Sequence, residues 1–250
     1  MGTNERVAVV TGGGSGIGRA SALRLASLGY AVAALDIDPG RAATVAAELQ
    51  ATGQRACGLT IDVAIEDSVR LTFDQVRSRL GPVSILVSSA GIADFTPFAE
   101  MTTAAFDRMI AVHLRGTFLC CREAFADMAA QHSGRIVTIA SVAALNGGGG
   151  PGLAHYVAAK AGIVGLTKAI AFEGGPHGIT ANTIAPGLVD TPLIRGAGSP
   201  DSFYDKIVAR LPVPRLGAPD DIAGAVAYLV SDDAAWVTGQ VLSPNGGAWI

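Results

Sequence analysis

The sequence predicts a single α/β domain over residues 1–250, built on one doubly wound parallel sheet of about seven strands with helices on both faces. Three observations support this prediction. Short apolar runs alternate with helical segments along the chain, these runs are apolar at nearly every position, and neither a low-complexity linker nor an internal repeat divides the sequence. Strands that are apolar throughout are buried on both faces, as they are in a parallel sheet covered by helices.

The elements follow one another in a regular order. Residues 6–12, RVAVVTG, predict the first strand, and the helical segment 18–29 ends at Gly29, a residue type that favours helix C-termini. The further strands are predicted at 30–38, 54–63, 83–91, 134–141, 178–187 and 239–247. The further helices are predicted at 41–53, 67–80, 102–132 and 155–173.

Segment 187–214 differs from the rest of the chain. It is rich in Gly, Pro and Ser, and it holds one short helical patch at 202–210, SFYDKIVAR. Ligands of doubly wound folds bind outside the carboxyl ends of the strands. We therefore interpret 187–214 as a substrate-loop insertion over that edge of the sheet.

Composition excludes several classes of function. Charged residues make up 16% of the chain, the net charge is −3, and no basic stripe suited to nucleic acid is present. The sequence shows neither a bilayer-spanning apolar stretch nor a signal peptide, so we expect a cytoplasmic protein with no membrane partner. Cys57, Cys120 and Cys121 have no partners at metal-ligand spacing, and the four histidines form no cluster, so no metal is expected.

The eight residues TGGGSGIG at 11–18 predict a nucleotide-binding turn between the first strand and the first helix. Gly12, Gly16 and Gly18 give the spacing GxxxGxG rather than the commoner GxGxxG. The physical requirement is the same, because the backbone must approach a pyrophosphate closely and the helix N-terminus offers free N–H groups. A tight turn without a ligand is the alternative, but the flanking strand and helix favour the nucleotide.

Asp36, at the end of the second strand, favours NAD over NADP. An acid at this position accepts hydrogen bonds from the adenosine ribose hydroxyls and repels a 2′-phosphate. Neither Ser15 nor Ile37 supplies a basic group in its place, and Arg41 is expected on the next helix, facing water. A solvated acid at a strand end is the alternative interpretation of Asp36.

The segment HYVAAKAG at 155–162 places a phenol and an ammonium one helical turn apart, at Tyr156 and Lys160. A cation about 4 Å from the phenolate stabilises it by roughly 4 kcal/mol at an effective dielectric constant of 20. That is about 3 pK units, so we expect the tyrosine pKa to fall from about 10 toward 7, where acid–base catalysis is most effective. Ser141, at the end of strand 134–141, is a candidate to hold the substrate oxygen.

Each of these residues has a structural explanation when it is taken alone. A Tyr–Lys pair at helical spacing is commonly a surface pair, and a serine at a strand end is commonly a turn residue. Their order favours catalysis, because a nucleotide turn is followed by Ser141 and then, 15 residues later, by the YxxxK pair.

Together these features resemble the short-chain dehydrogenase/reductase family, and in particular its 3-oxoacyl-thioester reductase-like branch. The resemblance covers essentially the whole chain and also rests on Asp62–Val63, on SSAG at 88–91, on PGLVDTP at 186–192 and on TGQVL…GG near the end. It implies a Rossmann-type fold and an oxidoreductase that interconverts a secondary alcohol and a ketone with NAD(H). It also implies a homo-oligomer, a tetramer or a dimer.

The resemblance and the residue patterns assign two sets of site residues. The catalytic candidates are Ser141, Tyr156, Lys160 and His113. The cofactor-binding candidates are Gly12, Ser15, Gly16, Ile17, Gly18, Asp36, Asp62, Val63, Ser89, Ala90, Gly91, Tyr156, Lys160, Pro186, Gly187, Val189 and Thr191. The resemblance implies that Val189 and Thr191 hold the nicotinamide carboxamide and that Lys160 holds the nicotinamide ribose.

Two departures from the family pattern stand out. Ser88 and Ser89 replace two asparagines, and we expect the serines to keep local hydrogen bonds. His113 replaces the family's helix asparagine, whose role is to shape a kink in that helix. His113 either joins a proton relay or packs as a hydrogen-bonded ring. A catalytically retired NAD(H)-binding sensor or scaffold is the alternative function, and a purely structural oligomer is a weaker third.

The expected substrate pocket is mainly apolar. Its loop residues are Ala93, Phe95, Leu145, Leu153, Leu188, Leu193 and Ile194. This suits a small-molecule alcohol or ketone of modest polarity, such as a 3-hydroxyacyl or 3-oxoacyl thioester. Arg195, Lys206 and Arg210 are candidates to meet an acidic carrier, with solvated surface charges as the alternative.

Overall fold

The computed structural model describes residues 6–148, 150, 152–196 and 201–250, and its centre is one sheet of seven parallel strands. The strands lie in the order β3-β2-β1-β4-β5-β6-β7. They are β1 (Val7–Thr11), β2 (Ala31–Asp36), β3 (Ala56–Thr60), β4 (Val83–Ser88), β5 (Gly134–Ile139), β6 (Ile179–Ile184) and β7 (Val241–Leu242). The strand order reverses between β1 and β4, as in a doubly wound sheet. The predicted fold class is confirmed.

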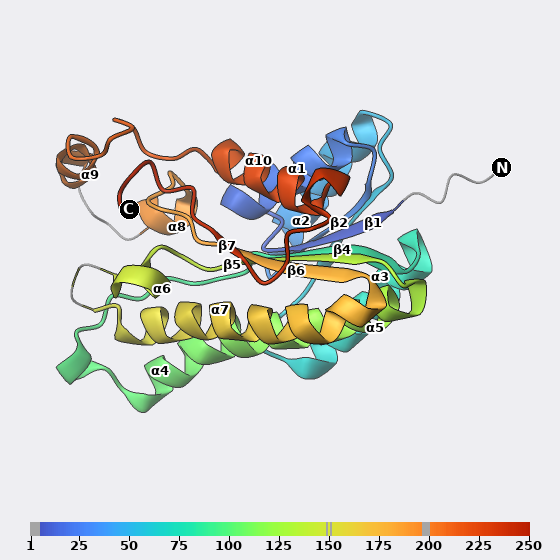
Figure 1. Ribbon diagram of the computed structural model, residues 1–250, viewed down its shortest axis with the longest axis horizontal. Coiled ribbons are helices and arrows are strands. Elements are labelled where there is room, and N and C mark those ends of the chain that lie inside the picture. Colours follow the sequence, from blue (N-terminus) through green and yellow to red (C-terminus); the bar gives the residue numbers. More distant parts are fainter. Residues whose placement is uncertain (1–5, 149, 151, 197–200) are drawn as a thin grey trace.

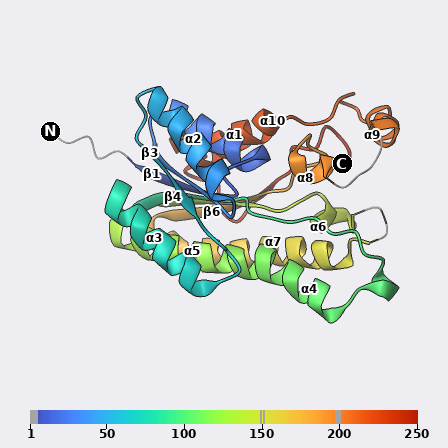
Figure 2. The ribbon, with the colours of Figure 1, turned by 180° about the vertical axis from the view of Figure 1, so that it is seen from behind.

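Helices cover both faces of the sheet (Figure 1). One layer holds α1 (Gly16–Ser27), α2 (Pro39–Ala51) and α10 (Pro219–Val230). The other holds α3 (Glu66–Leu80), α5 (Gly116–Gln131) and α7 (Ala154–Gly174), with α4 (Thr103–Ile110) extending from it, as Figure 2 shows from behind. The short helices α6 (Ala143–Asn146), α8 (Pro192–Arg195) and α9 (Asp201–Val208) lie at the carboxyl end of the sheet.

The core consists of two apolar layers, one on each face of the sheet. In β1, Val7 and Val9 pack in the layer of α3 and α5, whereas Ala8 and Val10 pack in the layer of α1 and α10. All four residues are at most 2% exposed. Burial on both faces explains why β1 is apolar at four successive positions, Val7 to Val10, rather than at alternate ones.

Two helical features differ from the sequence prediction. The predicted helix 102–132 is observed as α4, a π-helical turn over Ala111–Arg115, and α5. No helix was predicted between 214 and 239, and α10 shows that this was wrong; it begins at Pro219, and Asp221 caps it by accepting the Ala218 N–H at 2.7 Å. Within the described ranges, no helix is long and apolar enough to cross a membrane.

Candidate active site

A cavity of about 610 Å³ runs along the carboxyl ends of the strands. All four catalytic candidates line it, and so do all the cofactor-binding candidates except Val189. Val189 is buried and lies beside Gly217, whose N–H and C=O bond to Leu188 and Asp190. The backbone N–H and C=O of Val189 therefore point away from Gly217, because these groups alternate sides along extended chain.

The glycine turn brings the backbone close to this cavity at the start of α1. Gly16 has a φ of +49°, which L-residues with a side chain rarely adopt. A Cβ atom on Gly18 would overlap the Gly12 carbonyl. The side chain of Ser15 does not cap the helix, so the first N–H groups of α1 stay available for a ligand. This open helix N-terminus and close backbone approach fit a dinucleotide pyrophosphate.

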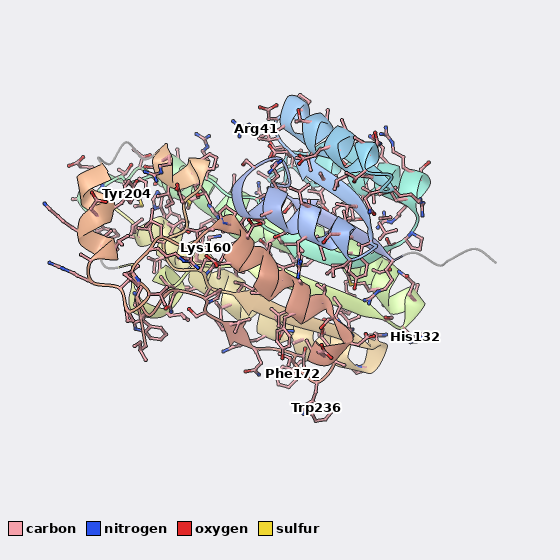
Figure 3. The ribbon with its side chains drawn as sticks, turned by 90° about the horizontal axis from the view of Figure 1, so that it is seen from above. Arg41, His132, Lys160, Phe172, Tyr204 and Trp236 are labelled. Carbon is pink, nitrogen blue, oxygen red and sulfur yellow. The ribbon has the colours of Figure 1, made fainter. Side chains whose placement is uncertain are left out.

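Asp36 is held in a fixed orientation at the next strand end. Its Oδ2 accepts the Gly14 N–H and its Oδ1 accepts the Asp38 N–H, both at 3.0 Å. The residue is only 6% exposed but lines the cavity. Arg41 was expected to face water; it is exposed and pairs with Asp38 at 3.3 Å, but it also lines the cavity, near the edge of the molecule in Figure 3.

The end of β4 is tied to β1 and α5 by hydroxyl groups. The buried Thr11 hydroxyl accepts the backbone N–H groups of Ser89 at 3.2 Å and Ala90 at 3.3 Å. The Ser88 hydroxyl bonds to that of Thr117 at 3.1 Å. The Ser88 side chain therefore keeps a local hydrogen bond, whereas Ser89 is bound through its backbone N–H. Sequence reasoning missed the role of Thr11, although a polar residue at the end of a buried strand is a usable signal.

Tyr156 and Lys160 lie on α7 and face the cavity beside Ser141. Lys160 is 5% exposed, lies inside the molecular outline in Figure 3, and donates from Nζ to the Ile139 carbonyl at 2.7 Å. Its Nζ is 5.6 Å from the centre of the Tyr156 ring. Tyr156 is half-buried and within hydrogen-bond reach of the Ser141 hydroxyl.

Burial controls the ionisation of this pair. It lowers the pKa of Lys160 to about 7, because the ammonium has lost its water. It also raises the pKa of Tyr156 above its usual value, and the hydrogen bond from Ser141 offsets only part of that rise. The expected fall of the Tyr156 pKa toward 7 is therefore wrong for this structure. The ammonium is held at the Ile139 carbonyl, and desolvation outweighs its attraction for the phenolate.

His113 lies in the π-helical turn and is 1% exposed. Its Nε2 is 2.9 Å from the Ile92 carbonyl and 3.1 Å from the Ile92 N–H, and its ring meets the Tyr156 ring edge-on with centroids 5.5 Å apart. Burial, with the nearby Lys160 charge, lowers its pKa to about 3. A ring that stays neutral at physiological pH favours the packing interpretation over a relay through imidazolium. A Cβ on Gly91 would clash with this ring.

His155 anchors the start of the same helix. It is fully buried, and its Nδ1 accepts the Tyr156 N–H at 3.0 Å. Its Nε2 lies 3.7 Å from Oδ2 of Asp94 in the loop after β4. His155 therefore lies between that loop and the helix that carries Tyr156, and its Nε2 has no hydrogen-bond partner within the described residues. Across the described part of the chain, no group of three His, Cys, Asp or Glu side chains is placed to hold a metal ion.

Comparisons with known proteins agree with this geometry. A family model described as enoyl-(acyl carrier protein) reductase matches residues 12–248. The "(2S)-[(R)-hydroxy(phenyl)methyl]succinyl-CoA dehydrogenase subunit BbsD" of Thauera aromatica is 40% identical over 247 residues, covering 99% of this chain and 98% of that protein. A 3-oxoacyl-[acyl-carrier-protein] reductase of Staphylococcus epidermidis is 37% identical over 247 residues, covering 98% and 100%. The crystal structure of gox2181 superposes with a TM-score of 0.93 at 33% identity, covering 98% and 96%.

These matches decide between the functions that the sequence left open. The relatives are dehydrogenases and reductases of hydroxyl and keto groups, so the protein is an oxidoreductase that uses a nicotinamide cofactor. They do not support the alternative of a retired sensor or scaffold. A family model that spans most of the chain and relatives matched over nearly their whole length place the protein in one family. The chain belongs to the short-chain dehydrogenase/reductase family.

Proposed function

We propose that this oxidoreductase prefers NAD(H) and that Tyr156 exchanges the proton with the substrate oxygen. One observation carries the proposal: Ser141, Tyr156 and Lys160 share a single cavity with the glycine turn and Asp36. The volume of about 610 Å³ lies within the range of cofactor sites. The nicotinamide supplies the carbon that gives or takes the hydride when the cofactor is bound.

Each part of the dinucleotide is assigned to residues at one end of the cavity or the other. The turn from Gly12 to Gly18 would hold the pyrophosphate, and Asp36 would accept the adenosine ribose hydroxyls. Asp62 and Val63, at the end of the third strand, would border the adenine. Thr191 and the backbone of Val189 would hold the carboxamide. The Val189 N–H and C=O groups, which point away from Gly217, support this role.

The chain's own residues then handle the substrate oxygen and its proton. Ser141 orients that oxygen by hydrogen bonding, and Tyr156, protonated at neutral pH because its pKa is raised, donates to a forming alkoxide during ketone reduction. Lys160, with a pKa of about 7, is able to return a proton to the tyrosine. In alcohol oxidation the proton moves the opposite way. His113 acts as a packed, neutral support for the Tyr156 ring.

Removing the charge of Asp36 tests the proposed preference for NAD. We expect the wild-type kcat/KM for NAD to exceed that for NADP by about a hundredfold, because a like-charge contact with a 2′-phosphate costs several kcal/mol. Asp36→Asn keeps the side-chain shape but removes the charge, so the ratio is expected to fall at least about tenfold. Steady-state assays with both cofactors measure this ratio.

The matched control is Asp74→Asn, an exposed acid on α3 that lies outside the cavity. It is expected to leave the cofactor ratio unchanged. Equal use of NAD and NADP by the wild type, or an unchanged ratio in Asp36→Asn, would contradict the assignment of Asp36.

The substrate side of the proposal is an alcohol or ketone with an apolar body, such as an acyl thioester. A second cavity of about 490 Å³ adjoins the first, and Ala93, Phe95 and Leu193 line it. Leu145, Leu153 and Leu188, expected in this pocket, line neither cavity. Pro192 and Gly196 also line it, which supports the proposed insertion at 187–214 as one wall of the substrate site. The thioester-acting relatives support the same substrate class.

Exposed aromatic side chains support the proposed homo-oligomer. Phe172 on α7 is 87% exposed and Trp236 is 98% exposed, and Figure 3 shows both projecting from the same side of the molecule. Large exposed apolar groups of this kind mark interaction surfaces. We expect light scattering to give the mass of a dimer or tetramer, and a Phe172→Glu/Trp236→Glu variant to be smaller. A monomeric wild type would contradict this part of the proposal.

A cytoplasmic location completes the proposal. Cys57, Cys120 and Cys121 are all buried and unpaired. Burial raises the pKa of each thiol, that of Cys121 to about 12, so these side chains are poor nucleophiles. Buried free thiols are typical of proteins in a reducing compartment.

A further inference from the structure

The 490 Å³ cavity continues directly from the catalytic one. The two share the wall residues Gly91, Ile92, Arg108, Pro192 and Leu193. A molecule whose reacting carbon lies at Tyr156 therefore has room to extend past Arg108 toward Phe95 and Met109. The second cavity is large enough for a small organic group.

Arg108 supplies a positive charge where the two cavities meet. It lies on α4, is exposed, and has no hydrogen-bond or ion-pair partner among the described residues. Within the described part of the second cavity's wall, it is the one cationic side chain. Sequence reasoning missed Arg108 because a charged residue on a helix is ordinarily a solvated one.

The three cationic residues that we expected to meet an acidic carrier do not share the position of Arg108. Arg195 pairs with Asp190, with Nε 2.7 Å and Nη2 2.9 Å from the carboxylate oxygens. Lys206 and Arg210 are exposed and line neither cavity. Arg108 is therefore the guanidinium best placed to meet a substrate.

The second cavity also carries one acid, Asp94, but its carboxylate is already engaged. Oδ1 accepts the Thr96 hydroxyl at 2.7 Å, and Oδ2 faces Nε2 of His155 at 3.7 Å. The hydrogen bond from Thr96 lowers the pKa of Asp94, so the group stays ionised. Asp94 thus holds its own loop through Thr96. Within the described residues it forms no ion pair with Arg108.

Building on the proposed function, we infer that the substrate is a hydroxy acid or oxo acid whose own carboxylate binds Arg108. Apart from Asp94 the wall of the second cavity is mainly apolar. A guanidinium at its rim suits a carboxylate, because its planar N–H groups form paired hydrogen bonds with both oxygens. The carboxylate takes no part in the redox step. The interaction selects and orients the molecule while its alcohol or ketone carbon lies at Tyr156.

The test compares acids with their uncharged esters. The probes are levulinate and 3-benzoylpropionate, each beside its methyl ester, assayed with NADH. We expect the wild type to favour each acid over its ester in kcat/KM. Arg108→Gln is expected to raise KM for the acids by about 10- to 100-fold, the effect of losing a hydrogen bond to a charged group, with little change in kcat or in ester turnover. Raised salt should increase KM for the acids in the wild type only.

The matched control is Arg24→Gln, an exposed arginine on α1 that lines neither cavity and is expected to change nothing. Equal wild-type use of acid and ester would overturn the inference while leaving the proposed function intact. So would an equal loss for acids and esters in Arg108→Gln. A loss confined to coenzyme A thioesters would assign Arg108 to the carrier phosphates instead. Failure of the wild type to reduce any ketone, with either cofactor, would overturn the proposed function itself.

Discussion

Replacing Tyr156 by phenylalanine is expected to lower kcat by about 10²- to 10⁴-fold, the usual contribution of a positioned acid–base group. The substitution removes only the phenolic oxygen, so the ring keeps its edge-on contact with His113. The glycine turn and Asp36 are untouched, so NADH should bind with wild-type affinity. Steady-state assays give kcat, and titration of NADH fluorescence gives the affinity.

Tyr228→Phe is the matched control, because Tyr228 lies on α10, 44% exposed and outside both cavities. It is expected to retain full turnover. Unchanged kcat in Tyr156→Phe would remove the tyrosine from the mechanism. Loss of NADH binding together with activity would show that the substitution had disturbed the cofactor site.

Lys160→Met is expected to remove activity but to make the protein more stable. Turnover should fall at least about a hundredfold, because the tyrosine loses its proton partner. The free energy of unfolding should rise by about 1–3 kcal/mol, since an apolar side chain of similar size replaces a buried charge. Thermal or denaturant unfolding of both proteins measures the difference.

The stability gain of Lys160→Met should depend on pH. Burial lowers the folded-state pKa of Lys160 to about 7 from its usual value of 10.5. Below pH 7 the folded wild type bears the full cost of a buried ammonium, and this cost decreases as the pH rises from about 7 to 10.5 and the folded lysine loses its proton. The gain should therefore be larger at pH 6 than at pH 9. A gain that is equal at both values, or a loss at pH 6, would contradict the burial argument.

The sheet was predictable because its strands are buried on both faces. Runs such as VAVVT in β1 and VSILVS in β4 are mostly apolar, which favours strands of a parallel sheet that is covered on both faces. Helix α10 was missed although its buried residues recur at helical spacing, at Ile222, Ala223, Val226, Leu229 and Val230. Only Pro219 and the two acids after it marked its start. The π-helical turn at Ala111–Arg115 has no compositional signal at all.

The position of the site residues was more predictable than their ionisation. Strand ends and glycine turns in a doubly wound fold meet at one edge, so nearly every predicted residue lines the cavity. The pKa values of Tyr156 and Lys160 depend on how much water reaches them, which spacing on a helix does not reveal. Arg108 was not predicted, because its role depends on which helix face borders the substrate cavity.

Transfer of deuterium to a ketone substrate from NADH that carries deuterium at both positions of the nicotinamide C4 is the most direct test of this active-site assignment. Mass spectrometry of the product reports the result, with the wild type and Tyr156→Phe treated alike. We expect the wild type to yield an alcohol that carries one deuterium on its carbinol carbon, and the variant to yield almost none. Unlabelled alcohol from the wild type, or equal yields of labelled alcohol from both proteins, would contradict the account.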